Sequence, residues 1–211
     1  MKRYVIIVAA GSGKRIGGAV PKQFLEIDGT PILMRTIGAF SHIENIVVVL
    51  NEDYTDFWRE LCVKHNFNQP HTVVKGGAER FHSVKNALVS IPDDAIVAIH
   101  DGVRPFVTPD VIEEAFAVAE RDGAAVPVID CPDSVRILSN DGSENNPFDR
   151  SRVKLVQTPQ VFKAEIIKEA YNAEFDNSFT DDASVVERAG FKVTLTRGCT
   201  ENKKITFRSD L

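Results

Sequence analysis

The segment Tyr4–Phe24 reads YVIIVAAGSGKRIGGAVPKQF, a short hydrophobic run followed by a glycine-rich, basic loop. The first five residues are aromatic or β-branched, which is typical of a buried strand. The run continues through Ala9 into a loop that carries two cations, Lys14 and Arg15. In open parallel sheets such a loop lies at the carboxyl edge of the strands, where ligands bind. The segment therefore predicts an α/β fold with an anion site after its first strand.

Two familiar phosphate-binding loops do not fit this stretch. The dinucleotide motif requires glycine where Ile16 stands, and the Walker pattern requires serine or threonine where Arg15 stands. What remains is a loop whose glycines let backbone N–H groups approach oxyanions, with Lys14, Arg15 and Lys22 supplying positive charge. The pattern favours a triphosphate ligand. The structural alternative is a solvated turn with incidental basic residues.

Strand and helix patterns alternate on either side of this loop. The predicted strands are Tyr4–Val8, Asn45–Leu50, His71–Val74, Ala95–Ile99 and Ala124–Ile129. The predicted helices are Ile32–Phe40, Tyr54–His65, Glu79–Ser90 and Asp110–Arg121, the last opened by Thr108-Pro109 and closed by Gly123. Such alternation predicts parallel strands joined by right-handed helical crossovers. The fold class is therefore α/β, with a mostly parallel twisted sheet flanked by helices.

The alternation of strand and helix patterns stops in the later part of the chain. Ser134–Leu138 alternates as a strand, residues 140–142 form a turn signal, and Arg152–Val156 is predicted to be the returning strand. We interpret residues 131–155 as a protruding β-arm inserted into a single domain that spans residues 1–211. Two further helices are predicted at Ala164–Ala173 and Asp182–Ala189, and a last strand at Lys192–Leu195.

The composition argues against several classes of protein. Hydrophobic residues make up 43% of the 211-residue chain, enough for a continuous core, and the net charge of −5 argues against a general nucleic-acid binder. The apolar run before Gly11 is too short for a signal peptide or a membrane span. Cys62, Cys131 and Cys199 lack the spacing of a disulfide framework or a zinc site. We therefore expect a cytoplasmic protein without nucleic-acid or membrane partners.

Five segments together resemble the 2-C-methyl-D-erythritol 4-phosphate cytidylyltransferase family, and the resemblance spans nearly the whole chain. They are AAGSGKR at 9–15 with PKQF at 21–24, KGGAER at 75–80 with Ser83, HDGVRPF at 100–106, DRSR at 149–152 with QTPQ at 157–160, and NKKIT at 202–206. The resemblance implies a Rossmann-like nucleotidyltransferase fold. It also implies that CTP, with Mg²⁺, is joined to a small polyol phosphate and that pyrophosphate is released.

The family reaction needs positioning and charge stabilisation more than a general base, because its nucleophile is already an ionised phosphate oxygen. By resemblance, Arg15 and Lys22 stabilise the transition state and the leaving group. The resemblance places the nucleotide on Ala9, Ala10, Gly11, Gly13, Lys14, Gly76, Gly77, Arg80 and Ser83. The segment from Gly76 to Ser83 would read cytosine, and Arg80 is interpreted as either a structural or a phosphate contact.

The resemblance also implies a site for the polyol phosphate. Arg150 on the arm and Lys204 near the C-terminus would bind its phosphate, with Thr158 and Thr180 as hydroxyl partners. Helix capping is the structural alternative, above all for Thr180. A further hydroxyl is expected at the base of the arm. An ungapped comparison puts Cys131 there and a three-residue shift puts Ser134 there, and we favour the serine.

Asp101 follows the strand at Ala95–Ile99 and would reach the polyol hydroxyls or Mg²⁺, with Arg104 on the same loop. The structural alternative is that Asp101 caps the turn and pairs with Arg104. His100 is interpreted as structural rather than catalytic.

The arm implies a homodimer, because by resemblance it embraces a second subunit and lends residues to that subunit's site. Three other functions stay open. A sister family makes CDP-ribitol from ribitol 5-phosphate, but Phe148–Arg152 and Val126–Val128 resemble the methylerythritol enzymes more. A sugar 1-phosphate nucleotidyltransferase would use another base. A nucleotide-binding regulator would not require both anion sites.

Overall fold

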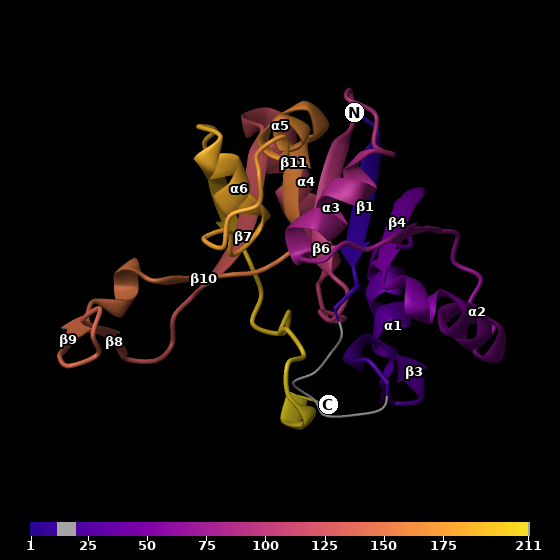
Figure 1. Cartoon of the computed structure of the whole chain (residues 1–211), viewed down its shortest axis with the longest axis horizontal. Helices are drawn as coiled ribbons and strands as arrows, with labels where there is room; N and C mark the ends of the chain where they lie inside the picture. Colours follow the sequence, from indigo (N-terminus) through magenta and orange to yellow (C-terminus); the bar gives the residue numbers. More distant parts are fainter. Residues whose placement is uncertain (12–19, 211) are drawn as a thin grey trace.

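A twisted, mostly parallel sheet forms the body of the molecule (Figure 1). The computed structural model describes residues 1–11 and 20–210, and within them this sheet has eight strands. Their hydrogen-bonded path is β10 (Lys154–Val156), β7 (Ala124–Asp130), β11 (Gln160–Lys163), β6 (Ile96–Asp101), β1 (Arg3–Val8), β4 (Asn45–Leu50) and β5 (Thr72–Lys75), and β12 (Thr194–Arg197) pairs with β7. β6, β1, β4 and β5 are parallel, whereas β10 and β11 run antiparallel to β7.

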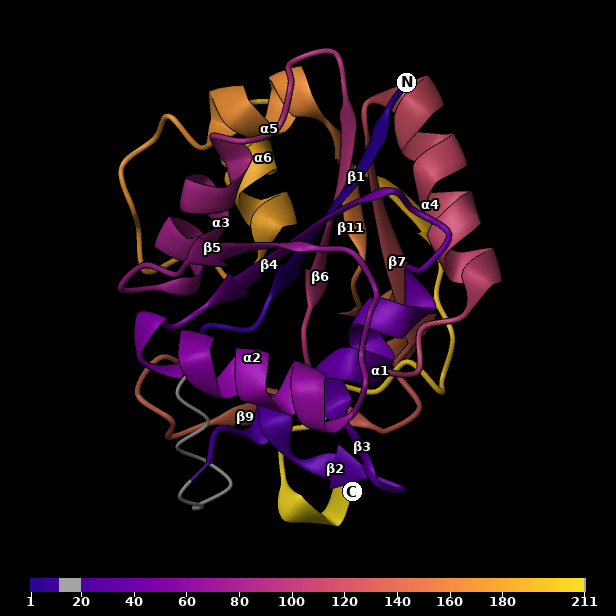
Figure 2. The same cartoon turned by 90° about the vertical axis from the view of Figure 1, so that its right-hand side faces the viewer.

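Alternate residues of β1 pack on opposite faces of the sheet. Val5 and Ile7 belong to the core cluster that contains residues of α1 (Ile32–Ala39), α2 (Thr55–Lys64) and α4 (Pro109–Asp122). Ile6 packs with α3 (Arg80–Leu88), α5 (Ala164–Ala170) and α6 (Asp182–Arg188). Figure 2 shows the sheet between these two layers of helices. A central strand covered on both faces explains the uninterrupted hydrophobic run of this segment. None of the helices in the described ranges is long and apolar enough to span a membrane.

The predicted helices and strands of the body are confirmed, although their ends shift by a few residues. Helix α4 has Thr108 at its N-cap and Pro109 in its first turn, and it ends at Gly123, whose φ of 97° favours glycine. β6 extends beyond Ile99 to Asp101. β11 was not predicted, because its apolar centre is very short and both of its end residues are polar.

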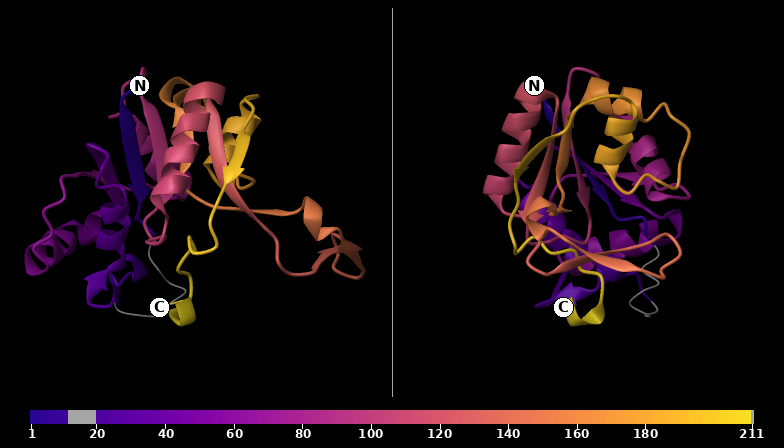
Figure 3. Two further views of the ribbon diagram at one scale, coloured as in Figure 1. Left: turned by 180° about the vertical axis from the view of Figure 1, so that it is seen from behind. Right: turned by 90° about the vertical axis from the view of Figure 1, so that its left-hand side faces the viewer.

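A small hairpin lies apart from the main sheet (Figure 1 and Figure 3). β8 (Val135–Leu138) pairs antiparallel with β9 (Asn145–Phe148), and the turn between them contains Gly142 with a φ of 73°. The predicted returning strand, Arg152–Val156, is therefore wrong. The chain returns earlier, through a segment without β-branched residues, and Lys154–Val156 instead pairs with β7 in the main sheet. The single-domain organisation and the use of the hairpin as a dimer arm stay predictions.

Candidate active site

The strand ends bring the predicted nucleotide residues together. Val8 and Asp101 are partners in the parallel register of β1 and β6, so both strands reach the same edge of the sheet. A cavity of about 420 Å³ opens at this edge. Its lining includes Ala9, Ala10, Gly11, Lys22, Gly77, Arg80, Ser83, Asp101 and Lys204 from the predicted set. Gly13, Lys14 and Arg15 lie outside the described residues.

Two glycines allow close packing beside this cavity, which Gly77 lines and the predicted residue Gly76 does not. A Cβ atom on Gly76 would lie 2.5 Å from Cβ of Ala10, and one on Gly77 would lie 2.3 Å from Cβ of His82. The backbone N–H of Gly77 donates to the Ser83 hydroxyl at 3.0 Å. Ser83 is buried and therefore shapes the turn that precedes α3.

Gln23 is a site residue that sequence reasoning missed. Its side chain is 3% exposed, and its Nε2 donates to the carbonyl oxygens of Ala9 at 2.6 Å and Gly11 at 3.0 Å. These bonds tie the start of the glycine-rich loop to the segment that carries Lys22. The only signal in the sequence was its place beside that lysine in the PKQF motif.

Asp101 lies at the centre of a cluster of three cations. Lys204 Nζ is 3.0 Å and Arg104 Nε is 3.3 Å from its Oδ2, while Arg80 Nε is 3.6 Å from its Oδ1. Burial by itself would raise the pKa of the Asp101 carboxyl. The charges of Arg80, Lys204 and Arg104 outweigh burial and hold that pKa well below its usual range. The carboxylate is therefore ionised at neutral pH. Its pairing with Arg104 is the contact that the structural alternative requires, and the predicted ligand roles of both residues stay predictions.

His100 is structural, as the sequence indicated. It is fully buried, and its Nε2 lies 3.0 Å from the carbonyl oxygen of Arg104. The Thr158 hydroxyl accepts a bond from the backbone N–H of Asp101 at 3.1 Å and lies 3.0 Å from Nδ1 of His100. One consistent arrangement has Nε2–H donating to Arg104 and the hydroxyl donating to Nδ1. Burial lowers the pKa of His100 to about 4, so the ring is neutral at pH 7.

This neutral histidine predicts a loss of stability in mild acid. Because the pKa of His100 is about 4 in the folded state and 6.5 without the fold, the unfolded state takes up a proton first as the pH falls. The stabilisation is complete above pH 6.5 and declines toward pH 4, so about 2 kcal/mol of the free energy of unfolding should be lost between pH 7 and pH 5. Urea unfolding at both pH values measures the loss. A His100→Gln variant that lost just as much would contradict this account.

Arg80 is held by a buried carboxylate from a distant part of the chain. Its two terminal nitrogens lie 2.8 and 2.6 Å from the carboxylate oxygens of Asp182, and Tyr171 Oη donates to the same carboxylate at 2.6 Å. Asp182 is 0% exposed. Burial alone would lower the pKa of Arg80, but Asp182 and Asp101 outweigh it and raise that pKa. The contacts support the structural interpretation of Arg80, which also lines the cavity. Asp182 and Tyr171 were not predicted.

Asp182→Ala is expected to reduce the free energy of unfolding by about 3 kcal/mol, because it leaves the Arg80 guanidinium and the Tyr171 hydroxyl without their shared partner. The Arg80 side chain is still 31% exposed, so the loss should fall at the low end for a buried ion pair. Chemical denaturation measures it. The matched control is Asp56→Ala, which breaks an exposed pair with Arg59 and should leave stability nearly unchanged. An equal loss of the free energy of unfolding in both variants would contradict the structural role of the Arg80–Asp182 pair.

A second cavity of about 240 Å³ adjoins the first. The two share Arg80, Asp101 and Lys204. The second is also lined by the predicted residues Arg104, Thr158 and Thr180. Thr180 is not the helix cap, because Asp181 occupies the N-cap of α6 and accepts a bond from the backbone N–H of Ser184. The geometry therefore offers two adjoining compartments that share one carboxylate and two cations, with Arg104 on the wall of the smaller one.

The residues predicted on the arm, 131–155, do not line these cavities. Neither Arg150 nor Ser134 is among the described residues that line the two cavities. Arg150 Nη1 donates to the carbonyl oxygen of Pro132 at 2.6 Å. Ser134 is exposed and Cys131 is half-buried, so the choice between them for the predicted hydroxyl position stays open.

Open α/β sheets bind nucleotides and other ligands at the carboxyl ends of their strands, which is where these two cavities and their cations lie. Comparisons with known proteins agree. The family model of 2-C-methyl-D-erythritol 4-phosphate cytidylyltransferase matches residues 4–211. The chain belongs to this family.

Individual relatives carry the same name. The enzyme of that name from Bacteroides thetaiotaomicron is 49% identical over 100% of this chain and 97% of its own, and the one from Bacteroides fragilis is 50% identical over the same shares. Among solved structures, 4-diphosphocytidyl-2C-methyl-D-erythritol synthase from Anaerococcus prevotii superposes with a TM-score of 0.83 at 28% identity, covering 99% of this chain and 94% of that one. These likenesses confirm the Rossmann-like nucleotidyltransferase fold.

Proposed function

We propose that the protein joins CTP and 2-C-methyl-D-erythritol 4-phosphate, giving 4-diphosphocytidyl-2-C-methyl-D-erythritol and pyrophosphate in the synthesis of isoprenoid precursors. The observation that carries the proposal is the cation cluster around Asp101, placed where two cavities meet in a chain of this family. Two anionic substrates can then occupy adjoining compartments, with positive charge at the point where their phosphates meet.

The larger compartment is the nucleotide side in this proposal. Lys22 lines it and supplies charge to the triphosphate, together with Lys14 and Arg15, whose roles rest on the sequence alone. The turn at Gly76 and Gly77 presents backbone groups to the cytosine ring. Because the N–H groups of both glycines already donate within the protein, the backbone carbonyl oxygens of this turn are the groups that would accept from the cytosine amine.

The smaller compartment is the polyol phosphate side. Lys204 holds the substrate phosphate there and Asp101 accepts hydrogen bonds from the polyol hydroxyls, with Arg104 and Thr180 on the surrounding wall. A phosphate oxygen of the substrate attacks the α-phosphorus of CTP, a new P–O bond forms, and the bond to pyrophosphate breaks. No side chain has to accept a proton, because the attacking oxygen is already ionised. A buried, neutral His100 agrees with that requirement.

A magnesium ion fits this site as a partner of the triphosphate. Among residues 1–11 and 20–210, no group of three or more His, Cys, Asp or Glu side chains could hold a metal by itself. Mg²⁺ in such enzymes is commonly bound by one or two carboxylates, water and substrate phosphates. Asp101, if it does not bind the polyol hydroxyls, is the ionised carboxylate that would hold the ion. Once bound, the ion would neutralise charge on the departing pyrophosphate.

A second copy of the chain completes the site in this proposal. Arg150 and Ser134 lie on the hairpin segment rather than in the described lining of the cavities, so their predicted roles require the cavity of a partner. The hairpin also exposes Ile137 and Leu138, at 50% and 63%. Exposed apolar side chains on an unpaired hairpin favour a contact with another copy. The protein is thus proposed to act as a homodimer through its β-arm.

We also place the enzyme in the cytoplasm. The support is that Cys62, Cys131 and Cys199 are all free thiols. Free, unpaired cysteines are typical of a reducing compartment.

Pyrophosphate release with CTP and Mg²⁺ tests the function. Initial rates should be far higher with 2-C-methyl-D-erythritol 4-phosphate than with ribitol 5-phosphate, and replacing CTP by ATP, GTP or UTP should abolish most of the rate. A preference for ribitol 5-phosphate would keep the chemistry and overturn the substrate. CTP binding without turnover on either substrate would overturn the enzyme assignment in favour of a regulator.

A further inference from the structure

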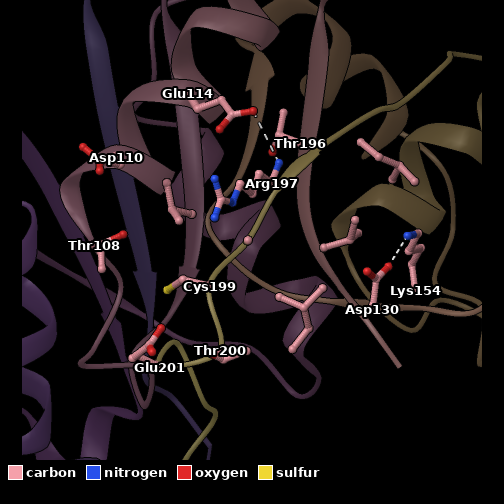
Figure 4. Close-up of a pocket in the computed structure, with 15 residues that line it drawn as sticks. Thr108, Asp110, Glu114, Asp130, Lys154, Thr196, Arg197, Cys199, Thr200 and Glu201 are labelled. Atoms are coloured by element: carbon pink, nitrogen blue, oxygen red, sulfur yellow. Dashed lines mark hydrogen bonds and ion pairs between the residues drawn. The ribbon is translucent and has the colours of Figure 1, made fainter. Parts of the chain in front are cut away.

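The segment that carries Lys204 has no regular secondary structure, yet its place is closely defined. Residues 198–204 follow β12 and lead to Lys204 beside Asp101. On one side this segment borders an open cavity of about 880 Å³, and Figure 4 shows Cys199, Thr200 and Glu201 along its wall. Core packing therefore does not hold that side of residues 198–201. The buried Ile205 holds the far end of the segment next to Lys204, and contacts on the inner side hold the residues before it.

Two buried amide side chains make those contacts. Gln157 is 4% exposed, and its Nε2 donates to the carbonyl oxygen of Cys199 at 2.8 Å while its Oε1 accepts from the backbone N–H of Cys199 at 3.2 Å. Asn202 is 0% exposed, and its Nδ2 donates to the carbonyl oxygen of Thr158 at 2.7 Å. The amides thus join the Lys204 segment to the link between β10 and β11.

The backbone of Asn202 extends this connection to the cation cluster. Its carbonyl oxygen accepts from Arg104 Nη1 at 2.8 Å, and Arg104 Nε in turn contacts Asp101. Gly198 allows the close approach, since a Cβ atom there would lie 2.5 Å from Gln157 Oε1 and 3.0 Å from the carbonyl oxygen of Val128. The side-chain Oδ1 of Asn202 is buried and accepts no hydrogen bond from the described residues, an arrangement that stability alone does not favour.

We propose that Gln157 and Asn202 are positioning residues that set the location of Lys204 against Asp101 and thereby the affinity of the smaller cavity for the phosphate of the second substrate. The inference rests on the proposed function, in which Lys204 binds that phosphate. Neither amide needs to touch the substrate. Both act by fixing the backbone from which Lys204 extends.

The test measures the Michaelis constants of both substrates in Gln157→Met and Asn202→Leu, which remove the amide groups at similar volume. The KM for 2-C-methyl-D-erythritol 4-phosphate should rise about tenfold or more, while the KM for CTP stays within about twofold. Gly198→Ala should act in the same direction by displacing the Gln157 amide. The matched control is Asn45→Leu. It removes the hydrogen bond from the Asn45 side-chain amide to the carbonyl oxygen of Arg3 at the other end of the sheet, and it should change neither KM.

A double-mutant cycle separates positioning from direct contact. Because Lys204→Ala is expected to be inactive, the cycle compares dissociation constants for 2-C-methyl-D-erythritol 4-phosphate, measured by titration calorimetry in the presence of CTP. If Gln157 acts through Lys204, Gln157→Met should change this constant by less than about twofold in a Lys204→Ala background, because the two losses are then not additive. Additive losses, or equal rises in both Michaelis constants, would overturn the inference. Should Asn202→Leu fail to fold, Gln157→Met carries the same test with Asn202 intact. Wild-type protein without turnover would overturn the proposed function itself, whereas an active wild type with unaffected variants would overturn only this inference.

Discussion

Lys22→Ala is expected to lower kcat by about a hundredfold to a thousandfold, with a much smaller change in the KM for CTP. Lys22 lines the proposed nucleotide cavity of about 420 Å³, and its Nζ donates to the carbonyl oxygen of Ile205 at 2.8 Å. Its charge is therefore held at the edge of the cavity that we propose for the triphosphate. Charge on the leaving group grows toward the transition state, so a fixed cation there stabilises the transition state more than the bound substrate.

Steady-state kinetics of pyrophosphate release measure this effect. The matched control is Lys168→Ala. Lys168 lies on α5, which begins at the amino end of β6, and its Nζ pairs with Asp93 at 2.6 Å. That variant should retain wild-type kcat. A Lys22→Ala enzyme with near-normal kcat and a strongly raised KM would instead show that Lys22 only binds the nucleotide.

Arg150→Ala and Lys204→Ala should each inactivate the enzyme, yet a mixture of the two should regain activity. If each site takes Lys204 from one copy and Arg150 from the other, a mixed dimer has one doubly altered site and one intact site. Random exchange of subunits would then restore about a quarter of wild-type activity. The structure gives the reason, because Lys204 is 3.0 Å from Asp101, whereas Arg150 lies in a short helix after the hairpin and is not among the described residues that line the two cavities.

The complementation is measured after the two inactive variants are partly unfolded together, refolded and assayed. Each variant refolded alone serves as the control and should stay inactive. No recovery in the mixture, although hybrid dimers are detected by native mass spectrometry, would contradict a shared site. Full activity of either variant alone would contradict the role of its residue.

The order and layers of the body could be predicted because each element leaves a periodic signal. The burial of Val5, Ile6 and Ile7 on both faces of the sheet appears in the sequence as an uninterrupted hydrophobic run, and Pro109 and Gly123 mark the ends of α4. β9 left no such signal, since Asn145-Asn146-Pro147 has low strand propensity and pairs only with its neighbour in the hairpin. β9 is a strand because it pairs in register with β8, and a local sequence pattern does not show which segment a strand pairs with.

The candidate site was predicted to the extent that family motifs identify its charged residues. Asp101, Arg104 and Lys204 do converge. The supporting residues were missed because buried polar side chains look like surface residues in a sequence. Asp182 meets Arg80 across 102 positions, and Asn202 meets Thr158 across 44, so no local spacing indicates either contact. Arg15, the central cation of the first motif, remains a prediction because it lies outside the described residues.

The mass of the product formed from CTP and 2-C-methyl-D-erythritol 4-phosphate tests the central claim most directly. The two adjoining cavities predict a single new species in which the cytidine and methylerythritol units are joined through a diphosphate, formed in step with one pyrophosphate per molecule. Pyrophosphate without this species would mean that water attacks CTP and that the smaller cavity does not hold the polyol phosphate. No consumption of CTP under conditions where it binds would contradict the assignment of the cation cluster around Asp101 as a catalytic site.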